Sequence, residues 1–173
     1  MSLEKLSAQI LITGGTIDSI YVGAKDTCVP LEQTCLPDYF KNIKADWELS
    51  FVEICMKDSR EINQEDRQRL IDEIKKSSNE NILITHGTYT MPDTARFLKA
   101  NLGENAKKII LTGAMIPLTG FSPSDASFNL GYSLASFKSA TPGIYVCMNG
   151  QVFEADEVLK LVNEGRFSSI FDK

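Results

Sequence analysis

Five short apolar runs constrain the fold more than any other feature of this sequence. Each run is continuous rather than alternating, which is typical of strands that are covered on both faces of a parallel sheet. Segments with a helical pattern separate most of these runs. The expected strands cover residues 8–13, 49–55, 81–85, 108–112 and 143–148.

Three of the intervening segments carry helix start and stop signals. "NQEDRQRLIDEIKKSS" at 63–78 has acids early, lysines late and Asn63 as its expected cap. In 93–103, Asp93 is the expected cap and Gly103 the expected end. A third helix is expected within 124–140, and a short one at 155–163.

The alternation of strand and helix predicts an α/β fold. We expect an open, mostly parallel sheet flanked by helices in three layers, Rossmann-like or flavodoxin-like. "NG" at 149–150 lies between two extended runs and predicts a late type I′ β-hairpin. With 173 residues, the chain is expected to form a single domain over 1–173.

Charge and composition exclude several classes of partner. The net charge is −5 and Lys and Arg form no run, which argues against nucleic acid and against anionic membranes as partners. No apolar stretch approaches the roughly 20 residues that cross a bilayer. The amino terminus lacks a secretory apolar region, so we expect a cytoplasmic protein. His86 is the only histidine and no Cys-x-x-Cys pair occurs, so neither a metal nor a cofactor is expected.

Glycine and hydroxyl residues follow four of the expected strands. The segments are "TGGT" at 13–16, "KDSR" at 57–60, "HGTYT" at 86–90 and "TGAM" at 112–115. Ligands of open α/β sheets bind beyond the carboxyl ends of the strands, so these segments predict one shared site. Glycines let backbone N–H groups approach a ligand and form an oxyanion hole, and a hydroxyl becomes a nucleophile when a base or cation activates it.

Taken singly, each of these features has a simpler explanation. "TGGT" lacks the Gly-Lys-Ser/Thr of a phosphate loop and is often only a turn. His86 is more typical of a hydrogen-bonded structural residue than of a catalyst, and Lys107 beside Lys108 is typical of a solvated lysine. The repetition at four strand ends is what favours a site.

The chain resembles the bacterial-type L-asparaginase family. "TGGTI" at 13–17, "HGTYTM" at 86–91 and "KKIILTGAM" at 107–115 look like its three signature blocks, in order and spacing. "DS" at 58–59 and "SDASFNL" at 124–130 fall where further blocks lie. The resemblance covers essentially the whole chain and implies the family's larger amino-terminal domain, without its smaller carboxyl-terminal domain.

The resemblance implies a hydrolase in which Thr16 is the nucleophile. Thr88 matches a second catalytic threonine, and Lys107 matches the lysine that pairs with it. An active-site flap is expected at 18–33, with Tyr21 as the nearest candidate for its assisting tyrosine. The residues implied in substrate binding are Gly15, Asp58, Ser59, Gly87, Tyr89 and Ala114.

One departure from the family bears on function. The residue after the second catalytic threonine is an aspartate in the family, where it completes a relay and binds the substrate's α-amino group. Here it is Tyr89, and a neutral phenol cannot replace a carboxylate. Arg60 adds positive charge to the pocket, which further favours an anionic ligand.

Two hypotheses follow. The first is an asparaginase-like amidohydrolase that acts on L-asparagine or a related small carboxylate amide. The alternative is a non-catalytic binder of a small dicarboxylate, or an accessory subunit, that has lost the relay. A homodimer or higher homo-oligomer is expected in either case, because apolar residues would otherwise be exposed. The residues expected at that surface are Phe153, Phe167, Ile170 and Phe171.

Overall fold

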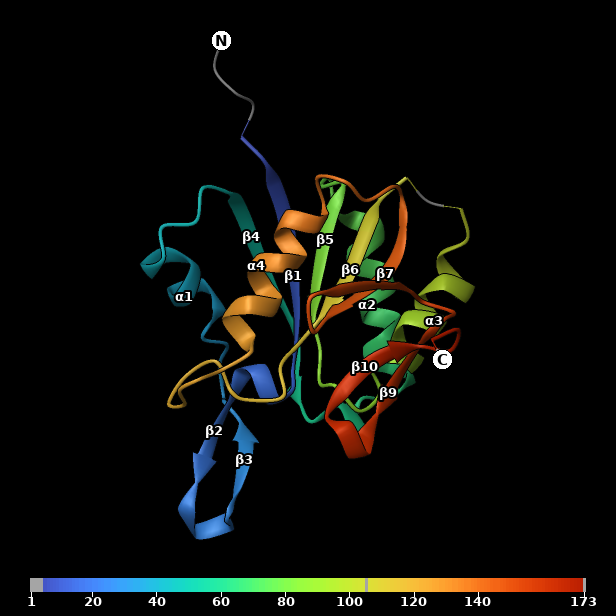
Figure 1. Ribbon diagram of the computed structural model, residues 1–173. Helices are drawn as coiled ribbons and strands as arrows, with labels where there is room; N and C mark the ends of the chain where they lie inside the picture. Colours follow the sequence, from blue (N-terminus) through green and yellow to red (C-terminus); the bar gives the residue numbers. More distant parts are fainter. Residues whose placement is uncertain (1–4, 105, 173) are drawn as a thin grey trace.

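A six-stranded sheet organises the protein in the computed structural model, which describes residues 5–104 and 106–172 (Figure 1). The strand order is β4-β1-β5-β6-β7-β8. Neighbours from β4 to β7 run parallel, and β8 runs antiparallel to β7. All five expected strands are present, so the predicted α/β fold is confirmed. Their bounds are β1 (Ser7–Gly14), β4 (Glu48–Lys57), β5 (Asn81–Thr85), β6 (Lys108–Thr112), β7 (Gly143–Met148) and β8 (Gln151–Glu154).

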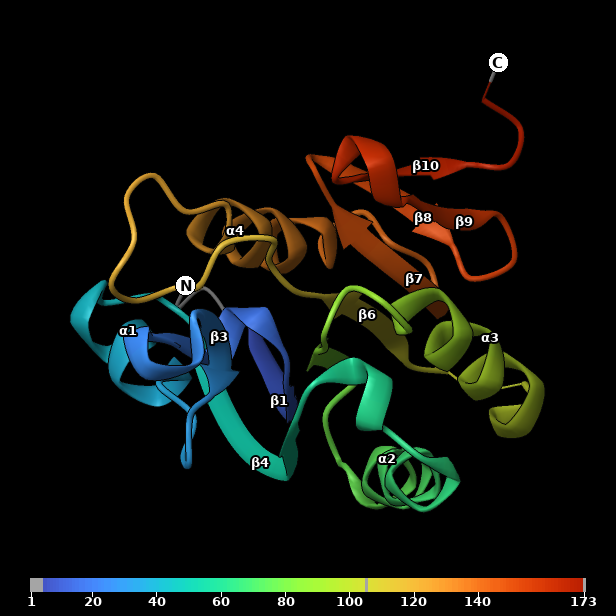
Figure 2. The same cartoon turned by 90° about the horizontal axis from the view of Figure 1, so that it is seen from below.

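Helices cover both faces of this sheet, as Figure 2 shows from below. In β1, Leu11 packs in the core layer under α2 and α3, whereas Ile10 and Ile12 pack in the layer under α1 and α4. Burial on both faces is the reason that the strands read as continuous apolar runs. The helices are α1 (Leu36–Asn42), α2 (Gln64–Lys76), α3 (Met91–Leu102) and α4 (Ala126–Ser136).

A capping box starts α2 at the expected residue. The Asn63 side chain accepts hydrogen bonds from the N–H groups of Glu65 and Asp66, at 2.9 and 3.0 Å. The Asp66 carboxylate accepts the Asn63 N–H at 3.1 Å in return. Three N–H groups at the start of the helix are thereby satisfied, with Asn63 as the cap that the sequence indicates.

The start of α3 differs from the expected one. Thr90 rather than Asp93 occupies the cap position, since Met91 and Pro92 already lie in the first turn. Proline is well suited to that turn because its missing N–H would have no partner there. Gly103 ends the helix with φ of 62°, as expected. The helix α4 is shorter than the segment 124–140 in which it is expected.

The carboxyl-terminal segment forms two hairpins. Asn149 and Gly150 join β7 to β8 with φ of 55° and 74°, the positive values that a type I′ turn requires. The prediction of a short helix at 155–163 is wrong. Instead β9 (Val158–Leu161) and a 3₁₀ turn lead into β10 (Arg166–Ser169), which pairs antiparallel with β9. This pairing depends on residues further along the chain, so the local pattern of 155–163 does not reveal it.

The expected apolar surface near the carboxyl end is only partly present. Phe153 and Phe167 are buried in the core with Val158, because the β9–β10 segment packs back onto the domain. Ile170 and Phe171 are exposed, Phe171 at 75%. Within the two described ranges, no helix is both long enough and apolar enough to span a bilayer.

A third hairpin occupies the segment expected to be a flap. After a 3₁₀ turn at Thr16–Asp18, the chain forms β2 (Ser19–Val22) and β3 (Thr27–Pro30), which project away from the end of β1 (Figure 1). The N–H of Leu31 donates to the Asp18 carbonyl at 2.8 Å and closes the base of the hairpin.

Candidate functional site

The ends of four parallel strands meet at one edge of the sheet. Gly14 at the end of β1 pairs with Lys57 of β4, and Ile12 pairs with Thr85 of β5. Thr85 in turn pairs with Thr112 of β6. The four glycine- and hydroxyl-containing segments therefore leave the sheet side by side, as their sequence pattern indicates. We call this edge the strand-end rim.

Glycines bring the segments of the rim into direct contact. A Cβ atom built on Gly15 would lie 2.4 Å from Cα of Gly87, and one on Gly87 would lie 2.7 Å from Cβ of Ser59. Gly15 also has φ of 81° and ψ of −173°, a region that is essentially restricted to glycine. The β1 and β5 loops thus touch at Gly15 and Gly87, and Thr16 and Thr88 are the next residue in each.

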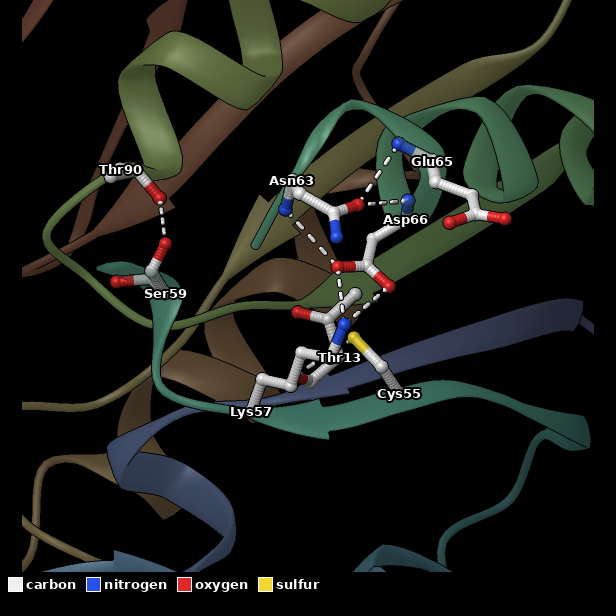
Figure 3. Close-up of polar contacts among 8 residues, drawn as sticks. All are labelled: Thr13, Cys55, Lys57, Ser59, Asn63, Glu65, Asp66 and Thr90. Atoms are coloured by element: carbon white, nitrogen blue, oxygen red, sulfur yellow. Dashed lines mark hydrogen bonds and ion pairs between the residues drawn. The ribbon is translucent and has the colours of Figure 1, made fainter. Parts of the chain in front are cut away.

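The β4 segment is fixed against the same loops. Ser59 is buried, and its carbonyl accepts a hydrogen bond from the Thr90 hydroxyl at 2.7 Å (Figure 3). Lys57 donates to both carboxylate oxygens of Asp66, at 2.9 and 2.7 Å. Residues 58–59, which the family resemblance implies in substrate binding, therefore lie at the rim beside Gly87.

Lys107 does not lie at this rim. It precedes β6 at the amino end of the sheet, where its ammonium group donates to the carbonyls of Ser77 and Asn79 at 2.7 and 2.8 Å. The five residues of β6 span roughly 16 Å at about 3.3 Å per residue, more than a lysine side chain can cover. The predicted pairing of Lys107 with Thr88 is therefore wrong, because a residue before a parallel strand lies at the edge opposite to the site.

Lys160 makes the contact that was expected of Lys107. It lies on β9, and its ammonium group donates to the Thr88 hydroxyl at 2.7 Å. Burial, followed by the neighbouring Arg60 guanidinium, lowers the pKa of Lys160. Sequence reasoning missed this residue because it placed 155–163 on a helix, and no motif in the segment marks the lysine.

Two cations lie close to the Tyr89 ring at the rim. The Lys160 nitrogen is 4.2 Å from the centre of the Tyr89 ring, and the guanidinium carbon of Arg60 is 5.1 Å from it. The Tyr89 residue is 52% exposed, so the ring forms part of the open surface of the site. Arg60 also binds both oxygens of Asp58 at 2.9 and 2.8 Å, and this contact lowers the pKa of the Asp58 carboxyl group.

Two other expected site residues have different surroundings. The hydroxyl of Tyr21 donates to the Asp26 carboxylate at 2.6 Å, within the flap hairpin. Tyr21 also lines a mostly apolar cavity of about 370 Å³ with Ile20, Gly120 and Phe121. The Ala114 side chain is buried in the core layer under α4, so only its backbone is available to the rim. Among residues 5–104 and 106–172, no three His, Cys, Asp or Glu side chains are placed to hold a metal ion.

His86 is buried and forms hydrogen bonds through both ring nitrogens. Nδ1 lies 2.8 Å from the Gly87 carbonyl, which requires Nδ1 to carry the proton. Nε2 then accepts from the Thr94 hydroxyl at 2.9 Å, while that hydroxyl accepts from Nε of Arg67 at 3.2 Å. His86 thus holds the loop that carries Thr88.

Acid is expected to destabilise the fold through His86. Burial lowers the pKa of His86 from 6.5 to about 4, so between these pH values the unfolded chain binds more protons than the native state. The stabilisation that neutral His86 gives the native state is therefore complete above pH 6.5. As the pH falls from 6.5 toward 4, the free energy of unfolding is expected to fall by about 3 kcal/mol. Urea unfolding of the protein and of His86→Gln across this range checks it, because the variant must lack this part of the loss. Equal pH dependence in both would contradict the prediction.

The chain matches a known protein family along almost all of its length. The family described as "Asparaginase, N-terminal" matches residues 8–170 of the chain. The chain belongs to this family. The fold supports the assignment, because the thermostable L-asparaginase from Thermococcus kodakarensis superimposes with a TM-score of 0.81 at 27% identity, over 95% of this chain and 51% of that chain. A probable cytoplasmic L-asparaginase from Campylobacter jejuni gives a TM-score of 0.75 at 31% identity, over 95% and 52%.

Sequence relatives within the family are longer proteins. A glutaminase-asparaginase from Pseudomonas fluorescens biotype A is 32% identical over 172 residues, covering 89% of this chain and 45% of that protein. One from Acinetobacter glutaminasificans is 41% identical over 95 residues, covering 53% and 28%. The chain thus spans about half, or less, of the length of the relatives that it matches.

Proposed function

We propose that this protein is an asparaginase-like amidohydrolase that releases ammonia from L-asparagine or a related small carboxylate amide. The observation that carries the proposal is the 2.7 Å hydrogen bond from Lys160 to the Thr88 hydroxyl. This hydrogen bond joins the Lys160 side chain to a threonine whose loop contacts the Thr16 loop through Gly15 and Gly87. A hydroxyl next to a base or a cation is the arrangement that nucleophilic catalysis requires.

In the proposed reaction the Thr16 oxygen attacks the amide carbon, or Thr88 and Lys160 activate a water for the same attack. The lowered pKa of Lys160 makes its neutral amine more accessible, and in that form Lys160 accepts a proton through Thr88 and returns it to the leaving nitrogen. Backbone N–H groups near Gly15 and Thr88 would stabilise the oxyanion. The carbon–nitrogen bond breaks, ammonia leaves, and water cleaves the ester where Thr16 attacked, which restores its hydroxyl.

Ammonia release from L-asparagine and from succinamate tests the proposal. Purified protein is expected to release ammonia from at least one of these amides, while Thr16→Ala, in which the nucleophile is missing, is expected to release none above the blank. Both proteins should unfold at similar urea concentrations, since Thr16 is half-buried at the start of a 3₁₀ turn. If neither amide gives a signal that depends on Thr16, the proposed activity is wrong.

Tyr89 favours a second candidate function. The neutral Tyr89 ring lies beside Arg60 and Lys160, so the site could bind a dicarboxylate without turning over an amide, alone or as an accessory subunit. Calorimetry with succinate or aspartate separates the two functions, since this candidate requires binding without any ammonia release. Self-association into a homodimer or larger oligomer belongs to both proposals and is supported by the exposed Ile170 and Phe171.

A further inference from the structure

Two cations face the open side of the strand-end rim. Lys160 and Arg60 approach the Tyr89 ring at 4.2 and 5.1 Å, and the guanidinium of Arg60 is close enough to contribute to the lowered pKa of Lys160. Lys160 also donates to Thr88, so the positive charge lies next to the reacting groups of the proposed function. A ligand that enters here meets a positive field over an aromatic surface.

The carboxylates near the rim are already engaged by protein donors. Asp58 accepts from the backbone N–H and the guanidinium of Arg60. Asp18 accepts from Thr34 and Cys35, and Asp125 from the N–H groups of two residues after β6. Asp66 is held by Lys57. An ammonium group on a ligand would therefore meet only carboxylates whose charge is already shared with protein donors.

We propose that the site selects amides whose chain carries a carboxylate but no α-ammonium group, and that Tyr89 sets this selection. The proposal rests on the proposed function and names its substrate class: monoamides of simple dicarboxylic acids, of which succinamate is the probe. A carboxylate at the rim gains charge-assisted hydrogen bonds from Arg60 or Lys160. An ammonium group beside it is repelled by the same two cations, and Tyr89 offers it no negative charge.

Tyr89 sets the selection because of where its ring lies. Arg60 and Lys160 both lie over the ring, at 5.1 and 4.2 Å from its centre, and an aromatic face attracts cations. A carboxylate in the place of this ring would be drawn to the same two cations and would also offer an ammonium group a partner. The side chain is exposed, so replacing it removes little core packing.

Binding of the two product acids, succinate and L-aspartate, tests the selection without any turnover. Isothermal titration calorimetry on the unmodified protein is expected to give at least tenfold tighter binding of succinate, since losing a charge-assisted contact changes affinity roughly tenfold to hundredfold. In Tyr89→Asp the succinate preference is expected to shrink by roughly tenfold or to reverse. In the matched control Tyr89→Phe, which keeps the ring faces, the preference is expected to persist.

Each outcome decides the matter. Equal or tighter binding of aspartate by the unmodified protein overturns the proposal, as does failure of both acids to bind. An unchanged ratio in Tyr89→Asp overturns the role of Tyr89, and a lost preference in Tyr89→Phe does the same. Failure of the proposed function looks different: the succinate preference persists while Thr16-dependent ammonia release is absent with both amides.

Discussion

Replacing Lys160 by methionine is expected to lower kcat/KM for amide hydrolysis at least about a hundredfold. The Lys160 ammonium is 2.7 Å from the Thr88 hydroxyl, and methionine keeps a similar stem but offers no proton and no charge. Groups that transfer a proton in the transition state contribute about 10²–10⁴-fold. Steady-state ammonia release with the better of the two amides measures the effect, and circular dichroism checks that the variant folds.

Lys107→Met is the matched control for this prediction. The ammonium of Lys107 donates to the carbonyls of Ser77 and Asn79 at the opposite edge of the sheet, so the variant is expected to lose some stability and keep its kcat/KM. A loss in Lys107→Met that equals the loss in Lys160→Met would contradict the assignment. Full activity in Lys160→Met would contradict it more directly.

Gly15→Ala is expected to lower the free energy of unfolding by about 4 kcal/mol. The cost combines backbone strain of about 1–3 kcal/mol with overpacking of about 1–3 kcal/mol. The strain arises because φ of 81° with ψ of −173° is a glycine conformation, and the overpacking because the new Cβ would lie 2.4 Å from Cα of Gly87. Urea unfolding followed by circular dichroism gives the change.

Gly131→Ala separates this local effect from a general effect of added methyl groups. Gly131 lies inside α4, where a Cβ meets no atom within 4 Å. Alanine costs less conformational entropy than glycine in a helix, so the variant is expected to gain about 0.5–1 kcal/mol. A Gly15→Ala protein that loses less than about 1 kcal/mol would show that the two loops can separate without strain.

The sheet could be predicted from sequence because each strand carries its own signal. Residues 81–85, 108–112 and 143–148 coincide with β5, β6 and β7, since burial on both faces leaves an unbroken apolar run. Asn63 and Gly103 fix helix ends through local backbone chemistry that is visible in the sequence. The short helix α1 and the strands β2 and β3 carry weaker signals, and only a flap was expected near the latter two.

The candidate site could be predicted only in part. The rule that ligands bind at the carboxyl ends of parallel strands places Thr16, Ser59 and Thr88 at one edge, as the structure does. The same rule, applied to Lys107, would have placed it at the other edge. Lys160 could not be found in this way, because β9 is held at the rim by long-range contacts rather than by its own pattern.

The position of β9 has a consequence for how the protein acquires its chemistry. Lys160 on β9 follows all six strands of the main sheet in the sequence, so the amine joins the hydroxyls only after that sheet has been synthesised. A nascent chain that stops after β8 could pair its sheet and still lack the amine. Because Lys160 reaches Thr88 through a long-range contact, recovery of ammonia release during refolding is expected to lag behind recovery of helical circular dichroism, and would report docking of β9 and β10.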